Sequence, residues 1–286
     1  MSMEMKTVAD EVIKPVKAET PLTFISIIRN EYFLYAFSLV LFFIMWDLVA
    51  RMEILGNSLA TPYEVAKELA RLMTVRLAGK NLLGHIWAST QRILIGFTIA
   101  SVFAVPLGLL MALNRYINAI VKPVFDIFKP MPPIAWISVA ILWFGIEEAS
   151  KVFIIVIGTF VPCLLNAYNG VRLIDPELYD VVRMLGGNRR DEILQVCFPA
   201  AFPAIFAGLQ ISLSIAWTCV LAAELVSSRS GLGWIIIQGM RLTKPSLVIG
   251  GMALIALVAW LTTLLVSGLE RIVCPWKREI EVVSNR

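Results

Sequence analysis

The chain has 286 residues, of which 58% are hydrophobic and 16% charged, and its formal net charge is +4. Soluble domains usually carry about 25% charged residues. This composition and a mean hydropathy of +0.79 therefore exclude a water-soluble fold. Several long apolar stretches predict an all-α membrane protein instead. The basic balance calls for no nucleic-acid partner, because the cytoplasmic loops of membrane proteins are rich in Lys and Arg.

The apolar stretches predict six membrane-spanning helices, because backbone polar groups in lipid must be satisfied within the segment. In chain order, the expected spans are 32–50, 93–113, 117–144, 152–168, 204–226 and 247–269. Proline interrupts the third span at Pro123, Pro130, Pro132 and Pro133, and the fourth at Pro162. A proline break at membrane depth is tolerated where it lines a cavity. The third span is therefore expected to line a path or simply to kink.

The flanking segments predict one membrane domain with two tails. Residues 1–31 are mixed in charge and read as a cytoplasmic tail without a cleaved signal peptide. The membrane domain is expected at 32–278 and a C-terminal tail at 279–286. Segment 61–80 has apolar residues at helical spacing (Val65, Leu69, Leu72, Met73). We expect this amphipathic helix to pack against the bundle rather than to lie on the lipid surface.

Charge predicts the orientation in the membrane. Six spans place both termini on one side, and placing that side in the cytoplasm gathers most basic loop residues there. These residues are Arg29, Arg115, Lys122, Arg172, Arg183, Arg189, Arg190, Arg271, Lys277 and Arg278. We therefore expect a multi-pass membrane protein with both termini in the cytoplasm.

The longest predicted cytoplasmic loop, 170–198, has the pattern of two short helices. Asp175 precedes Pro176, which is typical of a helix cap followed by proline in the first turn. An apolar face follows at helical spacing, made of Leu178, Val181, Val182 and Leu185. Gly186 and Gly187 are suited to end the helix, since glycine readily takes positive φ.

The second helix of this loop would begin after Asn188 and carry Arg189, Arg190, Asp191 and Glu192, and Pro199 would open the approach to the fifth span. A helix pair with one apolar and one charged face suits docking into a groove on a partner protein. Lying on the lipid surface is the alternative.

A spaced motif in this loop carries a family resemblance. Asp180-Val181-Val182, three residues, Gly186, nine residues and Val196-Cys197-Phe198-Pro199 resemble the "EAA" loop of permease subunits of bacterial ABC importers. Asp replaces Glu, two Val replace Ala, Val replaces Ile and Phe replaces Leu. In that family the loop forms the coupling helix that sits on the ATP-binding subunit. The resemblance implies coupling roles for Asp180, Val181, Val182, Arg183, Gly186, Arg189 and Pro199.

Further segments resemble the nitrate/sulfonate/taurine branch of the same family. They are Lys129-Pro130-Met131-Pro132-Pro133-Ile134-Ala135-Trp136, Ile141-Leu142-Trp143-Phe144-Gly145-Ile146, Ala222-Ala223-Glu224-Leu225 with Ser230-Gly231-Leu232-Gly233, and Cys274-Pro275-Trp276. Together the segments cover about residues 60–278. The resemblance implies the type I importer (MetI-like) permease fold. It also implies a location in a bacterial inner membrane, a second copy of the permease, two ATP-binding subunits that carry ATP and Mg, and a periplasmic or lipid-anchored binding protein.

The chain itself is expected to hold no catalytic site, cofactor or metal. No Gly-x-x-x-x-Gly-Lys-Ser/Thr motif occurs in it, so ATP phosphates would be held elsewhere. The single histidine, His85, lies outside the expected spans and cannot anchor a metal cluster. The four cysteines, Cys163, Cys197, Cys219 and Cys274, are isolated and expected to be buried.

Candidate pathway residues lie in the third and fifth spans: Pro132, Pro133, Trp136, Trp143, Gln210, Ser214, Thr218 and Glu224. The hydroxyls could instead bond to the preceding helical turn. Glu224 lies near the outer end and could equally be structural. Asp126 and Lys129, one turn apart, could pair with each other. Tryptophans at span ends (Trp46, Trp87, Trp234, Trp260) are most simply interface anchors.

The resemblance implies the permease subunit of an ATP-driven importer for a small anion, with taurine or another alkanesulfonate first. Nitrate, bicarbonate or an aromatic acid are alternative substrates. An ion-gradient-driven secondary transporter would require inverted repeats and intramembrane ionisable residues. An intramembrane enzyme would require clustered catalytic side chains, and a pure scaffold would leave the glycine-hinged loop without a role.

Overall fold

The computed structural model describes residues 31–53 and 56–276, and the expected tails at 1–31 and 279–286 lie almost entirely outside these ranges. The chain divides into two compact units, 1–56 and 57–286, each described by itself. In the first unit, α3 (Glu31–Arg51) is a continuous apolar helix with exposed side chains on all sides, such as Leu39 and Phe42. An apolar helix of this kind suits a lipid-facing span.

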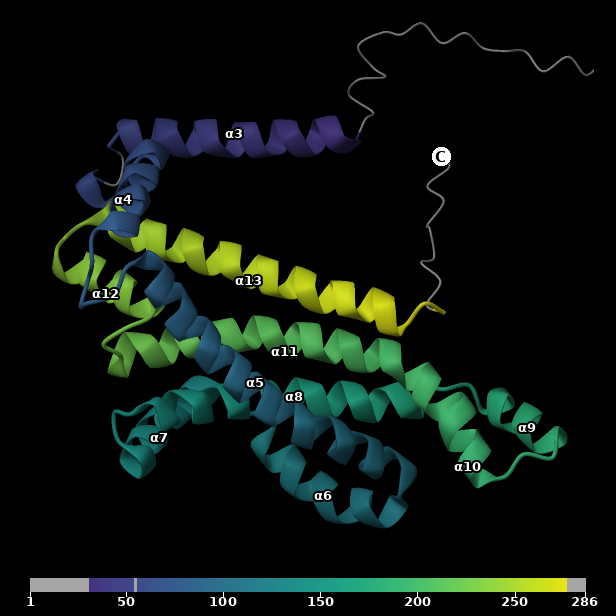
Figure 1. Ribbon diagram of the computed structural model, residues 1–286. Helices are drawn as coiled ribbons and strands as arrows, with labels where there is room; N and C mark the ends of the chain where they lie inside the picture. The colour runs from purple at the N-terminus through teal and green to yellow at the C-terminus, as the bar shows by residue number, and fades with distance from the viewer. Residues whose placement is uncertain (1–30, 54–55, 277–286) are drawn as a thin grey trace, which may run out of the picture. The chain divides into compact units, whose positions relative to one another are not determined.

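The second unit is a helical bundle (Figure 1). Its elements are α4 (Pro62–Thr74), α5 (Leu82–Leu113), α6 (Arg115–Phe128), η2 (Pro133–Trp136), α7 (Ile137–Phe144), α8 (Glu148–Arg172), α9 (Pro176–Met184), α10 (Arg189–Asp191), η3 (Glu192–Cys197), α11 (Phe198–Ser227), α12 (Leu232–Arg241) and α13 (Pro245–Val273). In the described residues, five helices are long and apolar enough to span a membrane. Counted as one broken span, the bent pair 115–128 and 133–144 brings the number to the six expected from the sequence.

The third expected span is broken at its prolines. α6 and the η2–α7 segment meet at a bend of 85° around residues 129–132. Proline removes a backbone donor and clashes with the preceding turn, so the helix cannot run through Pro130, Pro132 and Pro133. The suggested pairing of Asp126 with Lys129 was wrong. Asp126 instead pairs with Lys122, one turn earlier, at 2.5 Å.

Two span boundaries differ from the sequence prediction. α5 begins at Leu82 rather than at Ile93, because the polar residues of its first turns are buried against other helices instead of ending the span. His85 therefore lies inside a spanning helix. The fifth span begins before the expected residue 204, because a helix runs without a break through residues 189–227, and Pro199 lies in the first turn of α11. A π-helical stretch, η3, precedes the proline and accommodates it in the first turn of α11.

Small residues let the central helices α5, α8 and α11 pack closely. A Cβ added at Gly108 of α5 would lie 2.5 Å from the Leu164 carbonyl oxygen of α8. A Cβ at Gly208 of α11 would lie 2.5 Å from Asn166 Cβ. All four cysteines are buried, as predicted.

The amphipathic helix α4 packs against α13, which confirms the preferred interpretation of segment 61–80. Val65 and Leu72 are buried on its apolar face. Thr61 and Glu64 form a capping box that fixes the start of the helix.

Candidate functional site: a helical loop and a buried ion cluster

Two polar regions lie at opposite ends of α8 and α11. The α9–α10 loop lies at one end, and α12 with the turn before it lies at the other (Figure 1). Both regions therefore adjoin the same two helices.

The α9–α10 loop is built as its sequence predicts. The Asp175 carboxylate accepts a hydrogen bond from the Glu177 amide at 3.0 Å and caps α9. Gly186 has a φ of 81° and reverses the chain. Asn188 then caps α10, and its own amide donates to the Asp191 carboxylate at 2.8 Å. Residues other than glycine rarely take the backbone conformation of Gly186, so the turn depends on it.

One ion pair joins α9 to the start of η3, and a second lies within α9. The Arg183 guanidinium donates to Glu192 at 2.7 Å and to Asp180 at 3.2 Å. These contacts raise the pKa of Arg183, chiefly through the hydrogen bond to Glu192. Asp180, the acidic residue of the family motif, therefore pairs with Arg183 inside α9, and Arg183 links α9 to Glu192 across the turn at Gly186. Their pairing is solvent-exposed, so it orients the loop more than it stabilises it.

The apolar residues of α9 separate into an inner and an outer face. Tyr179 packs against the core cluster around Val171, Cys197 and Ala201, and burial raises the pKa of its phenol to about 12. On the outer face, Met184 is 86% and Leu185 83% exposed. Leu178 and Val181 are also exposed, whereas Val182 is half-buried against Gly187. An exposed apolar face on a well-anchored helix suits a protein partner.

The C-terminal end of α13 is tied to the start of α11. The Trp276 indole donates to the Pro199 carbonyl oxygen at 3.0 Å. Gln210, a candidate pathway residue, donates to the Glu270 carboxylate at 2.7 Å. The Cys274-Pro275-Trp276 segment and the motif proline, 77 residues apart, therefore meet at the loop end of the bundle.

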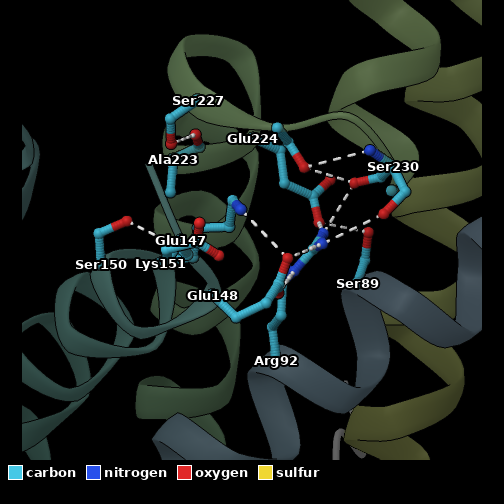
Figure 2. Close-up of polar contacts among 12 residues, drawn as sticks. Ser89, Arg92, Glu147, Glu148, Ser150, Lys151, Ala223, Glu224, Ser227 and Ser230 are labelled. Carbon is cyan, nitrogen blue, oxygen red and sulfur yellow. Dashed lines mark hydrogen bonds and ion pairs between the residues drawn. The ribbon is translucent and has the colours of Figure 1, made fainter. Parts of the chain in front are cut away.

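At the opposite end, a buried ion pair joins α5 and α11 (Figure 2). Arg92 Nη1 lies 2.6 Å from Glu224 Oε1. The same carboxylate accepts hydrogen bonds from Ser89 Oγ at 2.7 Å and from the Gly233 amide at 2.8 Å. A buried carboxylate needs such compensation because leaving it unpaired is costly. Glu224 is therefore fully satisfied by protein groups.

The first turn of α8 completes the cluster. Arg92 donates to both oxygens of Glu148, at 2.5 Å from Nε and 2.8 Å from Nη2. Lys151 Nζ donates to Glu148 Oε1 at 3.1 Å. Arg92 also donates to the carbonyl oxygen and the hydroxyl of Ser230. All three guanidinium nitrogens of Arg92 are thus in use.

The turn between α11 and α12 is held by the same polar groups. The Gly231 amide donates to His85 Nδ1 at 3.1 Å, and the Leu232 amide donates to Ser89 Oγ at 2.9 Å. His85 Nε2 lies 3.0 Å from the Leu77 carbonyl oxygen, which requires the tautomer with the proton on Nε2. Gly231 has a φ of 122°, and a Cβ there would collide with the Glu224 carboxylate. This Gly is therefore required on two counts.

The candidate pathway residues do not form one site in a single chain. Pro133 and Trp136 line a pocket of about 640 Å³ with Lys129 and otherwise mostly apolar side chains. Ser214 and Thr218 are exposed on α11, and each hydroxyl donates to the carbonyl four residues earlier. Pro132 and Trp143 are exposed. The pathway roles of all eight candidates stay a prediction.

The sequence pointed to Glu224 but not to its partners Ser89 and Arg92, nor to Glu148 and Lys151, which extend the cluster from Arg92. A usable signal was present: Arg92 lies between long apolar runs, and an ionisable side chain in a spanning helix faces a partner or a cavity. Trp234 stacks on the His85 ring with centroids 5.2 Å apart, a role beyond that of an interface anchor.

Comparison with known proteins shows the family. Residues 104–279 match the family described as "binding-protein-dependent transport system inner membrane component". The chain is 30% identical to the taurine transport system permease protein TauC of Escherichia coli, over 83% of this chain and 87% of that protein. It is 31% identical to the putative aliphatic sulfonates transport permease protein SsuC of Bacillus subtilis, over 83% and 85%.

The same similarity extends to permeases named for other anions. The nitrate import permease protein NrtB of Synechocystis is 26% identical over 92% of this chain and 96% of its own length. The bicarbonate transport system permease protein CmpB of Synechococcus elongatus is 33% identical over 67% and 69%. Similarity at this level therefore does not single out one substrate.

The fold is that of a solved importer permease. A chain of the MetNI methionine ABC transporter, in inward-facing conformations, matches with a TM-score of 0.58 and 17% identity, covering 67% of this chain and 95% of that chain. This likeness concerns the fold alone. Together with the sequence matches, it shows that the chain is a multi-pass member of the inner-membrane component family of binding-protein-dependent transport systems, the permease subunits of ABC importers.

Proposed function

We propose that two copies of this chain form the membrane path of an importer for a small oxyanion, with taurine or another alkanesulfonate first among substrates. Relatives named for taurine, aliphatic sulfonates, nitrate and bicarbonate support the class, since all four are small molecules with an oxyanion group. Members of the family are not enzymes, and separate subunits hydrolyse ATP. Family membership removes the ion-gradient-driven transporter and the intramembrane enzyme as explanations.

The coupling role of the α9–α10 loop rests on one observation. Its outer face exposes Leu178, Val181, Met184 and Leu185, while Tyr179 anchors the inner face to the bundle. Exposing apolar side chains of this size to water is unfavourable, so burying them in a groove of a partner would favour binding. ATP and Mg would be held by that partner, an ATP-binding subunit present in two copies.

This function implies one orientation of the chain across the membrane. With both termini and the α9–α10 loop in the cytoplasm, the Arg92–Glu224 end faces outward, toward a periplasmic or lipid-anchored binding protein. Nucleotide-driven motion of the ATP-binding subunits would move α9 and α10. The packed helices α8 and α11 would then shift between two discrete arrangements.

The pathway is assigned to the face that carries Trp136 and the proline break. The pocket of about 640 Å³ beside Pro133 and Trp136 is mostly apolar, and Lys129 supplies a cation at its rim. A weakly polar wall lets an anion pass without tight binding. Selectivity would then come mainly from the binding protein.

A substitution on the outer face of α9 tests the coupling role. Leu185→Asp places a charge where a partner groove should bury an apolar side chain, and the ATP-binding subunit should no longer co-purify. Tyr63→Asp is the matched control, because Tyr63 is a large exposed side chain on α4 near the other end of the bundle. Co-purification of Leu185→Asp at the level of Tyr63→Asp would refute the coupling assignment.

A further inference from the structure

The ion cluster at the outer end contains three buried charges and one exposed charge. The side chains of Arg92, Lys151 and Glu224 are 6%, 4% and 0% exposed, whereas that of Glu148 is 62% exposed. Glu224 is enclosed by Ser89, Arg92 and the Gly233 amide and cannot leave without stranding a buried charge. Glu148 can rotate into solvent, where water solvates its carboxylate.

Glu148 occupies a position that is built to hold an oxyanion. Its two oxygens receive the planar fork of Arg92 from Nε and Nη2, and one of them also receives Lys151 Nζ. A guanidinium fork with an ammonium beside it is a general arrangement for carboxylates and other oxyanions. Among the residues described, Glu148 is the acidic side chain within ion-pair distance of Lys151.

There is room for a second molecule beside Arg92 and Glu148, in a pocket that Lys151 does not line while Glu148 covers it. Arg92 and Glu148 line a pocket of about 320 Å³ together with Lys80, Trp87, Gln91 and Ser230. Lys80 Nζ lies 3.4 Å from Ser230 Oγ and adds a third cation at the rim. Without the Glu148 carboxylate, the buried part of the cluster holds two cations against one carboxylate, a net charge of +1. A monoanion would restore neutrality.

We propose that Arg92 and Lys151 form an oxyanion site at the outer mouth of the permease, and that the Glu148 carboxylate fills it until a substrate anion displaces it. The exchange replaces one monoanionic oxyanion group with another, so the charge of the cluster does not change. The site rests on the proposed function as an importer of small oxyanions, and it would receive the anion that the binding protein releases. Glu148 also excludes anions from this site between transport events.

The test measures anion binding by the purified complex with its ATP-binding subunit. Methanesulfonate, nitrate and bicarbonate are titrated at constant ionic strength, with chloride as the balancing ion. The fluorescence of Trp87, which lines the pocket, reports binding, and Trp87→Phe identifies its share of the signal. Glu148→Ala should bind the anions more than about tenfold tighter than the wild type, because a tethered competitor acts at high effective concentration.

Glu147→Ala is the matched control. Glu147 directly precedes Glu148, is exposed, and its side chain makes no capping hydrogen bond to α8. It should bind anions as the wild type does. Should Glu148→Ala fail to accumulate, Glu148→Gln removes the charge while keeping the packing, and the same gain is expected. In both Glu148 variants, added methanesulfonate should raise the unfolding temperature more than chloride does.

An unchanged anion affinity in the Glu148 variants, or an equal gain in Glu147→Ala, would overturn the site. The proposed function has a separate readout, ATP-dependent uptake by the wild-type complex. Uptake without any affinity gain would refute the site alone. An affinity gain in a complex that shows no uptake would refute the proposed function and leave the site supported.

Discussion

Arg92 on α5 and Glu224 on α11 are 132 residues apart in sequence and form a buried ion pair at 2.6 Å. Ser89 and Gly233 supply further hydrogen bonds to the same carboxylate, and Glu148 takes the other side of the guanidinium. The pair thereby joins α5, α8, α11 and the turn before α12 at one end of the bundle.

Removing one member of this pair should destabilise the protein strongly. Arg92→Met leaves the buried Glu224 carboxylate without its cation, which costs about 3–5 kcal/mol. Glu224→Leu should cost less, because Arg92 keeps its ion pair with Glu148. The double variant replaces the pair by apolar side chains and should recover much of that loss. Thermal unfolding of the three variants in one detergent checks this. Additive losses in the double variant would contradict the prediction.

Gly186 should be required for coupling. Its φ of 81° costs other residues about 1–2 kcal/mol, and more for a β-branched side chain. Gly186→Val should insert normally but lose the stimulation of ATP hydrolysis by substrate-loaded binding protein, because α10 leaves its position. Gly268→Val is the control, since a Cβ there meets nothing within 4 Å. Normal stimulation in Gly186→Val would remove the hinge role.

Tyr179 should titrate late and set an alkaline limit on the loop. Burial raises the pKa of the folded protein's phenol to about 12, compared with about 10 in an unfolded chain. The folded state holds this proton more tightly, so the contribution to stability is complete below about pH 10 and is lost as the pH rises toward about 12. Absorbance titration should show one late-ionising tyrosine that disappears in Tyr179→Phe. Its persistence in that variant would contradict the assignment.

Bulk at position 214 should block transport, whereas loss of the hydroxyl should not. The Ser214 hydroxyl donates to the Gln210 carbonyl at 3.2 Å, so Ser214→Ala leaves no unsatisfied group facing a path. Ser214→Trp should abolish uptake while the complex still assembles. Met252→Trp, an exposed position on α13, is the control for bulk alone. Uptake by Ser214→Trp at the control level would remove α11 from the pathway.

The loop could be predicted from sequence because its determinants are local. Asp175, Gly186 and Asn188 fix caps and a turn through hydrogen bonds to residues at most three positions away, and the structure has all three. Hydropathy likewise indicated the spans and the proline break, since both follow from single segments.

The ion cluster could not be predicted in the same way because its contacts are long-range. Arg92 meets Glu148 and Glu224 across 56 and 132 residues, and no local pattern pairs them. The same cause placed the start of the second span eleven residues late: His85, Ser89 and Arg92 lower the hydropathy of a segment whose polar groups are satisfied by other helices. Polar residues in a spanning helix are therefore best interpreted together with candidate partners on other spans.

Uptake by the purified complex in sealed proteoliposomes tests whether this chain is the membrane path of an ATP-driven importer. The ligand of the cognate binding protein is first identified by calorimetry, and its uptake is measured with ATP on the α9–α10 side and binding protein on the other. We predict uptake that requires ATP, the ATP-binding subunit and the binding protein, and that persists when ion gradients are dissipated. Uptake without ATP, driven by an ion gradient, would contradict it.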